Sequence, residues 1–490
     1  MTTVTLGRGA ITVTDPPPSL KNTLTYWKRE LMFDEVKHVR AVKGHYEDLY
    51  SIDGNTLTTL PGFGHKILEH FRKTGIKYSI VDKRIPLPEP DIEKACQGLR
   101  NHQFEPVIQM LLSGGGILSS STGTGKTVMA ASIIKAFNPD DLKMRGTPLT
   151  VFAAPDKDIN RKNWEELRVL LPDREVGLVM SGVKNFSEDV QVITLDSLHL
   201  LDPEDIGILI VDEVHSSASE TRVETISKIA NAARWGVSAT PSGRFDGGDM
   251  LIEGLFGPVV YQLTYQDAVR LGALVPIEVY WVKAPSPSVG MSYYLKYKNR
   301  DSKIRAAIIN NPPYSKLVAQ LLNKIPESKS VLCFTQWIAQ MANIHAHCPN
   351  VEYVHAQTKD GVGTICPITP KHRKELYDRM ASGEIRKMLA THCWKQGVNF
   401  KALDIVVNAS GGSSDIAAKQ IPGRASRRAD GKDKAYVVDF IHEWDVNEDG
   451  KPGPLLASDM SRKRSYRDLG FKQYTVDSIN ELPFIKEDTI

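Results

Sequence analysis

Residues 119–127 read SSSTGTGKT, and this stretch decides how the chain folds. A short apolar segment, GIL at 116–118, precedes it, and residues 128–134 after it have helical character. A strand, a glycine-containing loop and a helix in this order form a phosphate-binding loop. The glycines let backbone N–H groups surround phosphate oxygens, and the helix N-terminus favours negative charge. The strict motif has glycine where this chain has Ser120, so a surface turn rich in Gly and Thr is the alternative.

Composition sets limits on the class of protein. A chain of 490 residues is expected to form about three domains. The share of 41% hydrophobic and 24% charged residues is typical of a globular protein. The net charge of +3 neither requires nor excludes nucleic acid, because a balanced total can hide a local basic groove.

Cysteine spacing and hydropathy indicate the compartment. The five cysteines are scattered without a C-x-x-C motif, which predicts free thiols in a reducing environment. No apolar run approaches the roughly 20 residues of a membrane span, and no signal-peptide pattern is found. We therefore expect a cytoplasmic protein with no membrane partner.

The N-terminal part reads as a unit of its own. Residues 1–20 are polar and contain three consecutive prolines, which predicts an extended arm. Strand, helix and strand patterns follow between residues 48 and 84, with the helix over residues 66–72 ended by a glycine. We therefore predict a small α+β accessory domain over residues 1–90, closed by a proline-rich stretch.

The rest of the chain reads as two α/β lobes in tandem. Residues 147–240 alternate short apolar runs with amphipathic stretches, as in a parallel sheet covered by helices. This pattern predicts a first parallel-sheet lobe over residues 91–283, which contains the phosphate loop. A stretch rich in Pro and Ser then predicts a linker over 284–300, and recurring apolar strands predict a second lobe over 301–490.

The phosphate loop supplies candidate contacts to a nucleotide. Lys126 is expected to reach the β- and γ-phosphates, and the Thr127 hydroxyl to ligate Mg²⁺. Gln103 lies shortly before the loop, and its amide offers the donor and acceptor that an adenine edge requires. The predicted nucleotide-binding residues are Gln103, Ser121, Thr122, Gly123, Thr124, Gly125, Lys126 and Thr127.

An acidic pair and two small hydroxyl residues follow buried strands. Asp212 and Glu213 end the apolar run at 206–211, where open parallel sheets place their chemistry. Asp212 is expected to hold Mg²⁺, and Glu213 to orient or deprotonate the attacking water. A plain helix N-cap is the alternative. Ser238 and Thr240 can supply hydrogen bonds that sense the movement of a neighbouring loop.

A basic segment near residue 425 is the last candidate. Arg424 and Arg427 are three residues apart and therefore share one helical face. Their guanidinium groups suit phosphate oxygens, so both can point at one phosphate. A solvated basic helix or a plain nucleic-acid patch is the alternative.

The order of these stretches resembles the motifs of superfamily 2 helicases of the DExH type. The resemblance covers residues 95–440, and Asn399 stands where such families often carry Asp. The matching stretches, in motif order from the Q-type motif through motifs I, Ia, II, III, IV, V and VI, are residues 99–103, 120–127, 155 with 163–164, 212–215, 238–240, 331–335, 390–399 and 420–427.

Three further stretches, residues 236–247, 255–261 and 274–276, narrow the resemblance to DNA helicases of branch migration and repair. These are the phage UvsW-like, RecG-like and XPB-like groups. The resemblance implies an α/β chain of two RecA-like lobes that follow the accessory domain, with ATP between the lobes and Mg²⁺ as cofactor. It also implies forked, branched or single-stranded DNA as partner, a monomer or weak oligomer, and the host cytoplasm if the gene belongs to a phage.

The resemblance also assigns roles to residues. Lys126 and Glu213 are the catalytic residues expected of the first lobe, and Gln420, Arg424 and Arg427 those of the second, with the two arginines as fingers on the γ-phosphate. The residues expected to couple the site to nucleic acid are Ser238, Thr240 and Thr391.

Three other functions stay open on the residues alone. The chain could be an RNA helicase or remodeller, which differs in the nucleic acid that stimulates its ATPase. It could be the motor of a restriction system, although no nuclease cluster is visible. It could also be a nucleic-acid-binding module with a vestigial nucleotide site, which the presence of Lys126, Glu213 and Arg427 argues against.

Overall fold

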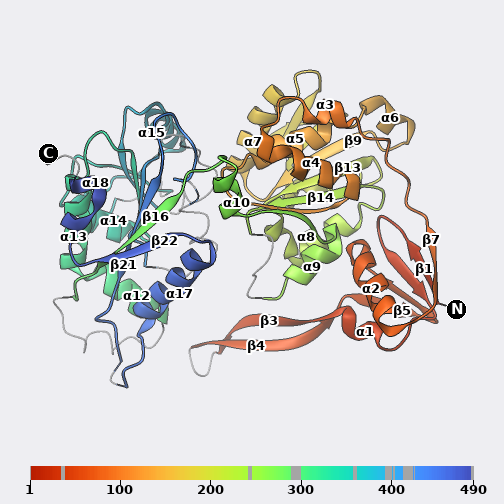
Figure 1. The fold of residues 1–490 in the computed structure, drawn as a ribbon, viewed down its shortest axis with the longest axis horizontal. Helices are drawn as coiled ribbons and strands as arrows, with labels where there is room; N and C mark the ends of the chain where they lie inside the picture. Colours follow the sequence, from red (N-terminus) through yellow and green to blue (C-terminus); the bar gives the residue numbers. More distant parts are fainter. Residues whose placement is uncertain are drawn as a thin grey trace. The chain divides into compact units, whose positions relative to one another are not determined.

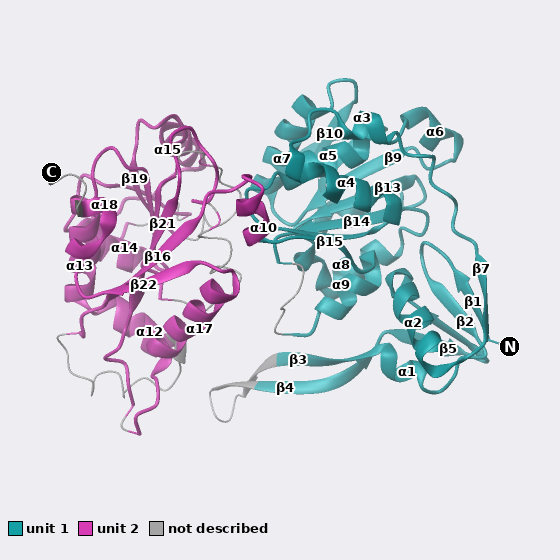
Figure 2. Ribbon diagram, viewed as in Figure 1, with its two compact units in different colours: residues 1–264 teal, residues 265–490 magenta. Residues whose placement is uncertain are grey.

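The computed structural model describes residues 2–34, 39–240, 246–287, 300–356, 361–391, 400, 403–411, 423, 425–447 and 449–486. The chain divides into two compact units, residues 1–264 and residues 265–490 (Figure 2). The first unit contains the N-terminal domain and the first parallel sheet, and the second unit contains the other parallel sheet (Figure 1).

The N-terminal domain is a mixed sheet packed against one helix. Its strands lie in the order β5-β6-β2-β1-β7, and helix α2 covers the core formed by Val4, Val13 and Phe71. Helix α2 ends at Gly75, whose φ of +69° favours glycine. The elements are β1 (Thr2–Leu6), β2 (Ile11–Thr14), α1 (Leu20–Thr23), β5 (Tyr50–Asp53), β6 (Thr56–Thr59), α2 (Gly64–Thr74) and β7 (Tyr78–Asp82).

The prediction of an extended arm over residues 1–20 was wrong. Residues 2–14 form β1 and β2, which lie inside the sheet between β6 and β7. The side chains of Val4, Ile11 and Val13 are buried at alternate positions, as a strand with one buried face requires. The prolines at 16–18 end this hairpin, since they follow β2 directly.

A long antiparallel hairpin interrupts the N-terminal domain. Strands β3 (Thr25–Asp34) and β4 (Val39–Asp48) pair with each other over their whole length and with no other strand among the described residues. The Arg29 N–H donates to the Asp246 carbonyl at 3.2 Å, so the hairpin touches the first lobe. Sequence analysis did not predict this hairpin.

The first lobe is a parallel sheet with helices on both faces. Its strands lie in the order β11-β10-β12-β9-β13-β14-β8-β15, and every neighbouring pair is parallel except β10 and β11. The strands are β8 (Gly116–Ser120), β9 (Leu149–Ala154), β10 (Val176–Met180), β11 (Val183–Asn185), β12 (Val190–Thr194), β13 (Ile206–Asp212), β14 (Ala233–Ser238) and β15 (Val259–Leu263).

Two apolar clusters, one on each face of this sheet, form its core. The helices of one face are α3 (Ile92–Cys96), α4 (Asn101–Ser113), α5 (Lys126–Lys135), α6 (Pro139–Met144) and α7 (Lys157–Leu170), and those of the other are α8 (Glu220–Ser227) and α9 (Asp249–Phe256). Every residue of β8, β9, β13 and β14 is buried, which explains the continuous apolar runs in the sequence.

The second lobe repeats this architecture. Its strands are all parallel in the order β18-β19-β17-β20-β21-β16-β22. They are β16 (Ile277–Lys283), β17 (Val331–Phe334), β18 (Glu352–Val354), β19 (Lys387–Ala390), β20 (Ile405–Asn408), β21 (Ala435–Ile441) and β22 (Lys472–Val476). The helices are α10 (Tyr265–Arg270), α12 (Arg300–Ile309), α13 (Pro312–Lys324), α14 (Ile338–His345), α15 (Pro370–Ser382), α17 (Pro454–Asp468) and α18 (Pro483–Lys486).

The predicted α/β class with two parallel-sheet lobes is confirmed, but the boundary between the lobes was misplaced. The sequence placed residues 91–283 in the first lobe and residues 301–490 in the second. Strand β16 instead pairs with β21 and β22 of the second sheet, and the units divide at residues 264 and 265. The apolar pattern of a strand shows that it is buried, but not which sheet buries it.

In the described ranges, no helix has the length and the apolar character needed to cross a membrane. Free thiols are confirmed for Cys96, Cys333, Cys348 and Cys366, while Cys393 lies outside the described residues.

A buried ionic cluster attaches helix α17 to strand β21 of the second lobe. Arg462 donates through Nε to Asp439 Oδ2 and through Nη2 to Asp439 Oδ1, both at 2.9 Å. Its Nη2 also donates to Asp459 Oδ1 at 2.9 Å, and the Tyr466 hydroxyl donates to Asp439 Oδ2 at the same distance. Neither carboxylate is exposed to solvent, so both take counter-charge from the guanidinium group, while Asp459 also contacts Nδ1 of His442 at 2.9 Å.

Removing this guanidinium group should therefore destabilise the second lobe. We expect Arg462→Met to lower the free energy of unfolding by about 3–5 kcal/mol, because two buried carboxylates lose their cation. Urea unfolding followed by tryptophan fluorescence measures the loss. Arg464→Met is the matched control, since Arg464 is exposed on the same helix. Equal unfolding midpoints for the two variants would contradict the assignment.

Candidate nucleotide-binding site

The predicted phosphate loop connects a buried strand to a helix. Strand β8 ends at Ser120, helix α5 begins at Lys126, and two glycines of the intervening loop, Gly123 and Gly125, have φ values of +95° and +88°. These left-handed conformations favour glycine. Residues 116–135 therefore form a strand, a loop and a helix, and the backbone is not an isolated surface turn.

Ser120, the departure from the strict motif, is part of the loop's internal bonding. Its side chain is buried, and its Oγ lies 2.6 Å from Oγ1 of Thr124. The Thr124 hydroxyl also donates to the Ser121 carbonyl at 2.8 Å. The serine therefore tightens the loop, and the loop does not need a glycine at this position.

Helix α4 holds the loop from its other side. Gln103 donates through Nε2 to the Thr124 carbonyl at 2.9 Å, and its Oε1 accepts from the Arg100 N–H at 3.0 Å. His102 Nε2 lies 3.0 Å from the same Thr124 carbonyl, and burial lowers the pKa of this histidine. A Cβ on Gly125 would collide with the Gln103 amide. Gln103 thus positions the loop, and its contact with adenine stays a prediction.

The acidic pair, Asp212 and Glu213, lies at the end of β13. This strand pairs with β14, which in turn pairs with β8, the strand that leads into the phosphate loop. Asp212 is buried, and its Oδ1 accepts from the Glu213 N–H at 2.9 Å. Glu213 has a φ of +49°, an uncommon conformation for a residue with a side chain. Such local strain occurs mainly where a function requires the geometry.

One asparagine connects the loop to the acidic pair. The Thr127 hydroxyl donates to Asn163 Oδ1 at 3.4 Å, and Asn163 Nδ2 donates to Asp212 Oδ2 at 3.3 Å. Asn163 lies on helix α7 and is buried. Sequence analysis quoted this residue only as part of a motif and gave it no role, because nothing in the local sequence shows that α7 faces the end of β13.

Burial and charge determine the ionisation of the acidic pair. Burial, together with the neighbouring Glu213 carboxylate, raises the pKa of Asp212 to about 6, and the Lys126 ammonium group acts in the opposite direction. A cation close to Asp212 would favour its charged form, as two carboxylates in a buried site require.

Glu213 of the acidic pair is hydrogen-bonded to Ser238, the last residue of the neighbouring strand β14. Ser238 Oγ lies 3.0 Å from Nδ1 of His215 and 3.4 Å from Oε2 of Glu213. The Thr240 N–H donates to the same Ser238 Oγ at 3.0 Å. Sequence analysis assigned no role to His215, which is the residue that brings Glu213 and Ser238 into one hydrogen-bonded group.

The remaining predicted residues belong to the second unit or lie outside the described residues. Thr391 follows β19, where its N–H donates to the Val354 carbonyl at 3.1 Å. Arg427 forms an isolated antiparallel bridge with Leu274. Gln420 and Arg424 lie outside the described residues, as does Asn399. The residues that the structure brings together are therefore Gln103, Lys126, Thr127, Asp212, Glu213, Ser238 and Thr240.

The raised pKa of Asp212 predicts how the metal-free protein responds to pH. In the unfolded chain this carboxyl has a pKa of about 4, so between pH 4 and 6 the folded state binds more protons and loses stability as pH rises. We expect Asp212→Asn to be more stable than the parent protein at pH 8 in EDTA, by up to roughly 3 kcal/mol.

This stability difference should shrink towards zero near pH 4, where Asp212 is protonated in both states. Thermal unfolding at a series of pH values measures it. Asp173→Asn is the control, since Asp173 is exposed in the same unit. If the stability difference between Asp212→Asn and the parent protein does not change with pH, the raised pKa of Asp212 is not its cause.

Two family models match the chain. The model described as type III restriction enzyme, res subunit, matches residues 97–243, and the helicase conserved C-terminal domain matches residues 314–429. The first match contains the phosphate loop and the acidic pair, and the second contains Thr391 and Arg427.

Three relatives have names that state a helicase or translocase. Putative helicase 22 of a Sulfolobus islandicus filamentous virus is 23% identical over 386 residues, which cover 73% of this chain and 66% of that protein. Probable helicase D10 of Escherichia phage T5 is 22% identical over 450 residues, 90% of each chain. The DNA 3'-5' translocase XPB2 of Sulfurisphaera tokodaii is 30% identical over 196 residues, 39% of this chain and 41% of its own.

Solved structures show the same fold. S. cerevisiae Dbp5 bound to RNA and ADP BeF3 aligns over 82% of this chain and 97% of its own, at 16% identity and a TM-score of 0.56. Both family models, the helicase relatives and the pair of RecA-like parallel-sheet lobes agree on the family. The chain belongs to superfamily 2 of the helicases, the enzymes that couple ATP hydrolysis to the unwinding of nucleic acid.

Proposed function

We propose that this chain is an ATP-driven DNA helicase or translocase that unwinds or migrates forked and branched DNA. The observation that carries the proposal is a pair of hydrogen bonds that connects Thr127 to Asp212 through Asn163. Thr127 follows Lys126 at the start of helix α5, and Glu213 follows Asp212. The groups that we propose to bind phosphate and to activate water thereby lie at one end of the first sheet. This is the arrangement that nucleotide hydrolysis by RecA-like lobes requires.

The donor set at this site fits a magnesium–nucleotide complex. Mg²⁺ prefers oxygen ligands, and the Thr127 hydroxyl and the Asp212 carboxylate both contact Asn163. These two residues would hold the metal, which supplies positive charge to the β- and γ-phosphates. Lys126 and the N–H groups of residues 121–125 would bind the phosphates themselves.

Glu213 is the proposed base. Its carboxylate lies 3.4 Å from Ser238 Oγ and 3.4 Å from His215 Nδ1, so its orientation depends on the end of strand β14. A base held in this way can orient a water molecule and accept its proton. Thr240 bonds to the same serine, and we propose that Ser238 and Thr240 report the state of the site to bound nucleic acid.

The second lobe is proposed to complete the site. Arg427 and Arg424 would act as arginine fingers on the γ-phosphate, with Gln420 beside them, and Thr391 would contact the strand. Closure of the lobes on ATP and reopening after hydrolysis would then move the chain along DNA.

One observation favours DNA over the alternatives: the archaeal relative with 30% identity is named a DNA translocase. An RNA substrate would appear as an ATPase stimulated by RNA but not by DNA. A restriction motor would require a separate nuclease partner for its activity.

Hydrolysis tests the roles proposed for the first lobe. We expect Lys126→Ala to lose ATP binding and turnover, because the phosphates lose their cation. We expect Glu213→Gln to bind ATP with near-normal affinity and to turn over at least 100-fold more slowly, because the water loses its base. ATPase rates and nucleotide titrations separate the two effects. Substantial turnover by Glu213→Gln would refute the role of Glu213.

The N-terminal domain is docked firmly on the first lobe. Lys66 and His65 contact the Glu253 carboxylate of helix α9 at 3.0 and 2.8 Å. The backbone at Gly62 and the ring of Phe63 pack so closely on the same helix that a Cβ on Gly62 or on Gly254 would collide. Of the basic residues that could bind DNA here, Lys66 is therefore occupied, whereas Arg72, Lys77 and Lys83 are exposed.

We propose that these exposed cations hold a duplex arm of branched DNA through its phosphates. The triple variant Arg72→Gln, Lys77→Gln, Lys83→Gln should keep an ATPase stimulated by single-stranded DNA. It should lose fork unwinding and four-way junction migration, and the slope of log affinity against log salt should fall by about 2–3.

A second triple variant keeps this test specific. Lys94, Lys143 and Lys228 are exposed lysines of the first lobe, and their change to glutamine removes the same charge from elsewhere on the unit. Junction unwinding at the parent rate by the N-terminal variant would contradict the grip on DNA. A shared loss of melting temperature would instead indicate a scaffold role.

A further inference from the structure

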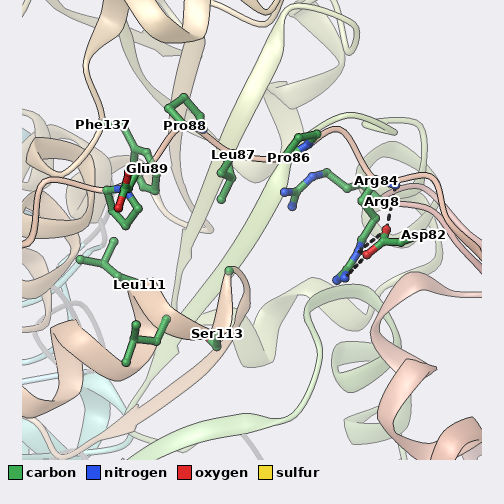
Figure 3. A pocket seen from close by; sticks show the side chains of 13 residues that line it. Arg8, Asp82, Arg84, Pro86, Leu87, Pro88, Glu89, Leu111, Ser113 and Phe137 are labelled. Atoms are coloured by element: carbon green, nitrogen blue, oxygen red, sulfur yellow. Dashed lines mark hydrogen bonds and ion pairs between the residues drawn. The ribbon is translucent and has the colours of Figure 1, made fainter. Parts of the chain in front are cut away.

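A pocket of about 360 Å³ lies where the N-terminal domain, the proline-rich stretch at 86–90 and helix α4 of the first lobe meet (Figure 3). Arg8, Asp82 and Arg84 line one end, and Leu111 and Phe137 line the other (Figure 3). None of these residues belongs to the candidate nucleotide-binding site, and none of the functions discussed above uses them.

Arg8 and Arg84 line the charged end of the pocket, and Arg145 lies beside Arg8 outside the lining. Arg8 Nε and Arg145 Nη2 both donate to the Ile85 carbonyl, at 3.0 and 3.2 Å, which brings the two cations close together. Arg84 joins them and forms a bidentate pair with Asp82, at 2.9 Å from Nε to Oδ1 and 2.6 Å from Nη2 to Oδ2.

Three guanidinium groups, those of Arg8, Arg84 and Arg145, lie together with one carboxylate, that of Asp82, which is bonded to Arg84. The other acidic residue that lines the pocket, Glu89, lies at the opposite end (Figure 3). Nε and Nη1 of Arg145 are buried with no hydrogen-bond partner among the described residues. Burial, with repulsion from Arg145 and Arg84, lowers the pKa of Arg8 to about 10.

Most of the remaining lining residues are apolar: the prolines at 86, 88 and 90, Leu87, Leu111, Leu112 and Phe137. Glu89 and Ser113 are the polar side chains among them. A concave apolar site with a few convergent charged groups at one end is the general form of a site for small ligands.

We propose that this pocket is a second anion-binding site, which takes a phosphate monoester carried on a flat apolar body such as a nucleotide. The phosphate would lie against Arg8, whose guanidinium donors suit phosphate oxygens. Arg84, whose Nε and Nη2 are bonded to Asp82, would add positive charge beside it. The base would lie between the prolines and Leu111. The phosphate can come from a free nucleotide or from the terminal nucleotide of a strand.

The alternative is that the arginines only fasten the proline-rich stretch to the first lobe through the Ile85 carbonyl. In that case Arg8→Gln lowers the melting temperature and changes no binding. The proposal predicts instead a loss of binding by a variant that stays folded.

The test uses the full-length chain with Lys126→Ala, in which the phosphate loop no longer competes for the ligand. We expect adenosine monophosphate to bind this protein in a calorimetric titration. Adding Arg8→Gln should weaken the binding at least about tenfold, because charge-assisted hydrogen bonds are lost. Adding Lys94→Gln, which removes an exposed charge outside the pocket, should change nothing.

A second variant tests whether a loss of binding comes from the pocket or from misfolding caused by Arg8→Gln. Ser113→Phe fills the pocket from its wall without a change in charge, and it should also weaken the binding of adenosine monophosphate. Adenosine, which lacks the phosphate, should bind at least about tenfold more weakly than the monophosphate. Absence of binding to the Lys126→Ala protein, or equal binding with and without Arg8→Gln, would overturn the proposal.

Binding of oligonucleotides distinguishes the two sources of the phosphate, a free nucleotide and the end of a strand. A strand with a 5'-phosphate should bind more tightly than the same strand with a 5'-hydroxyl, and only when Arg8 is present, if the pocket receives a strand end. If the free nucleotide alone depends on Arg8, the pocket receives a nucleotide from solution. Both results support the site, and independence from Arg8 in both arms refutes it.

Discussion

The buried carboxylate of Asp212 is the constraint on which the candidate site depends. It ends a strand whose residues are all buried, and a second carboxylate follows it directly in a left-handed conformation. Burial and then repulsion from the second acid raise the pKa of Asp212. Lys126 and the hydrogen bond from Asn163 offset this rise in part. The cation proposed for this site would offset the rest.

The parallel sheet makes this arrangement possible. Strands β8, β13 and β14 are neighbours or near neighbours and run in the same direction, so their carboxyl ends meet at one edge. The phosphate loop, the acidic pair and Ser238 therefore meet although up to 119 residues of sequence separate the stretches 119–127 and 212–238. Helices α4 and α7 then add His102, Gln103 and Asn163 from the covering face. The N-terminal domain packs on helix α9, which covers the other face of the sheet.

Much of the site could be predicted because its chemistry is local in sequence. Lys126 and Thr127 follow a glycine loop, and Asp212 and Glu213 end an apolar strand, so spacing alone identifies them. His215 and Asn163 carry no such signal: their roles arise from contacts with residues that lie 23 and 49 positions away. The arginine cluster was missed for the same reason, since Arg8, Arg84 and Arg145 come together only when the N-terminal strands, the proline-rich stretch and the loop after α6 are folded.

The sequence by itself determined the α/β class, the presence of two parallel-sheet lobes and the positions of the phosphate-loop and acidic-pair motifs, because periodicity and short motifs are properties of neighbouring residues. Only the tertiary structure decided which sheet each strand joins. Strand β16 reads as a continuation of the first lobe, yet its hydrogen bonds go to β21 and β22. Residues 2–14 read as a polar arm, yet they complete the N-terminal sheet. Strand pairing joins residues that are far apart in the chain, and no local pattern encodes the partner.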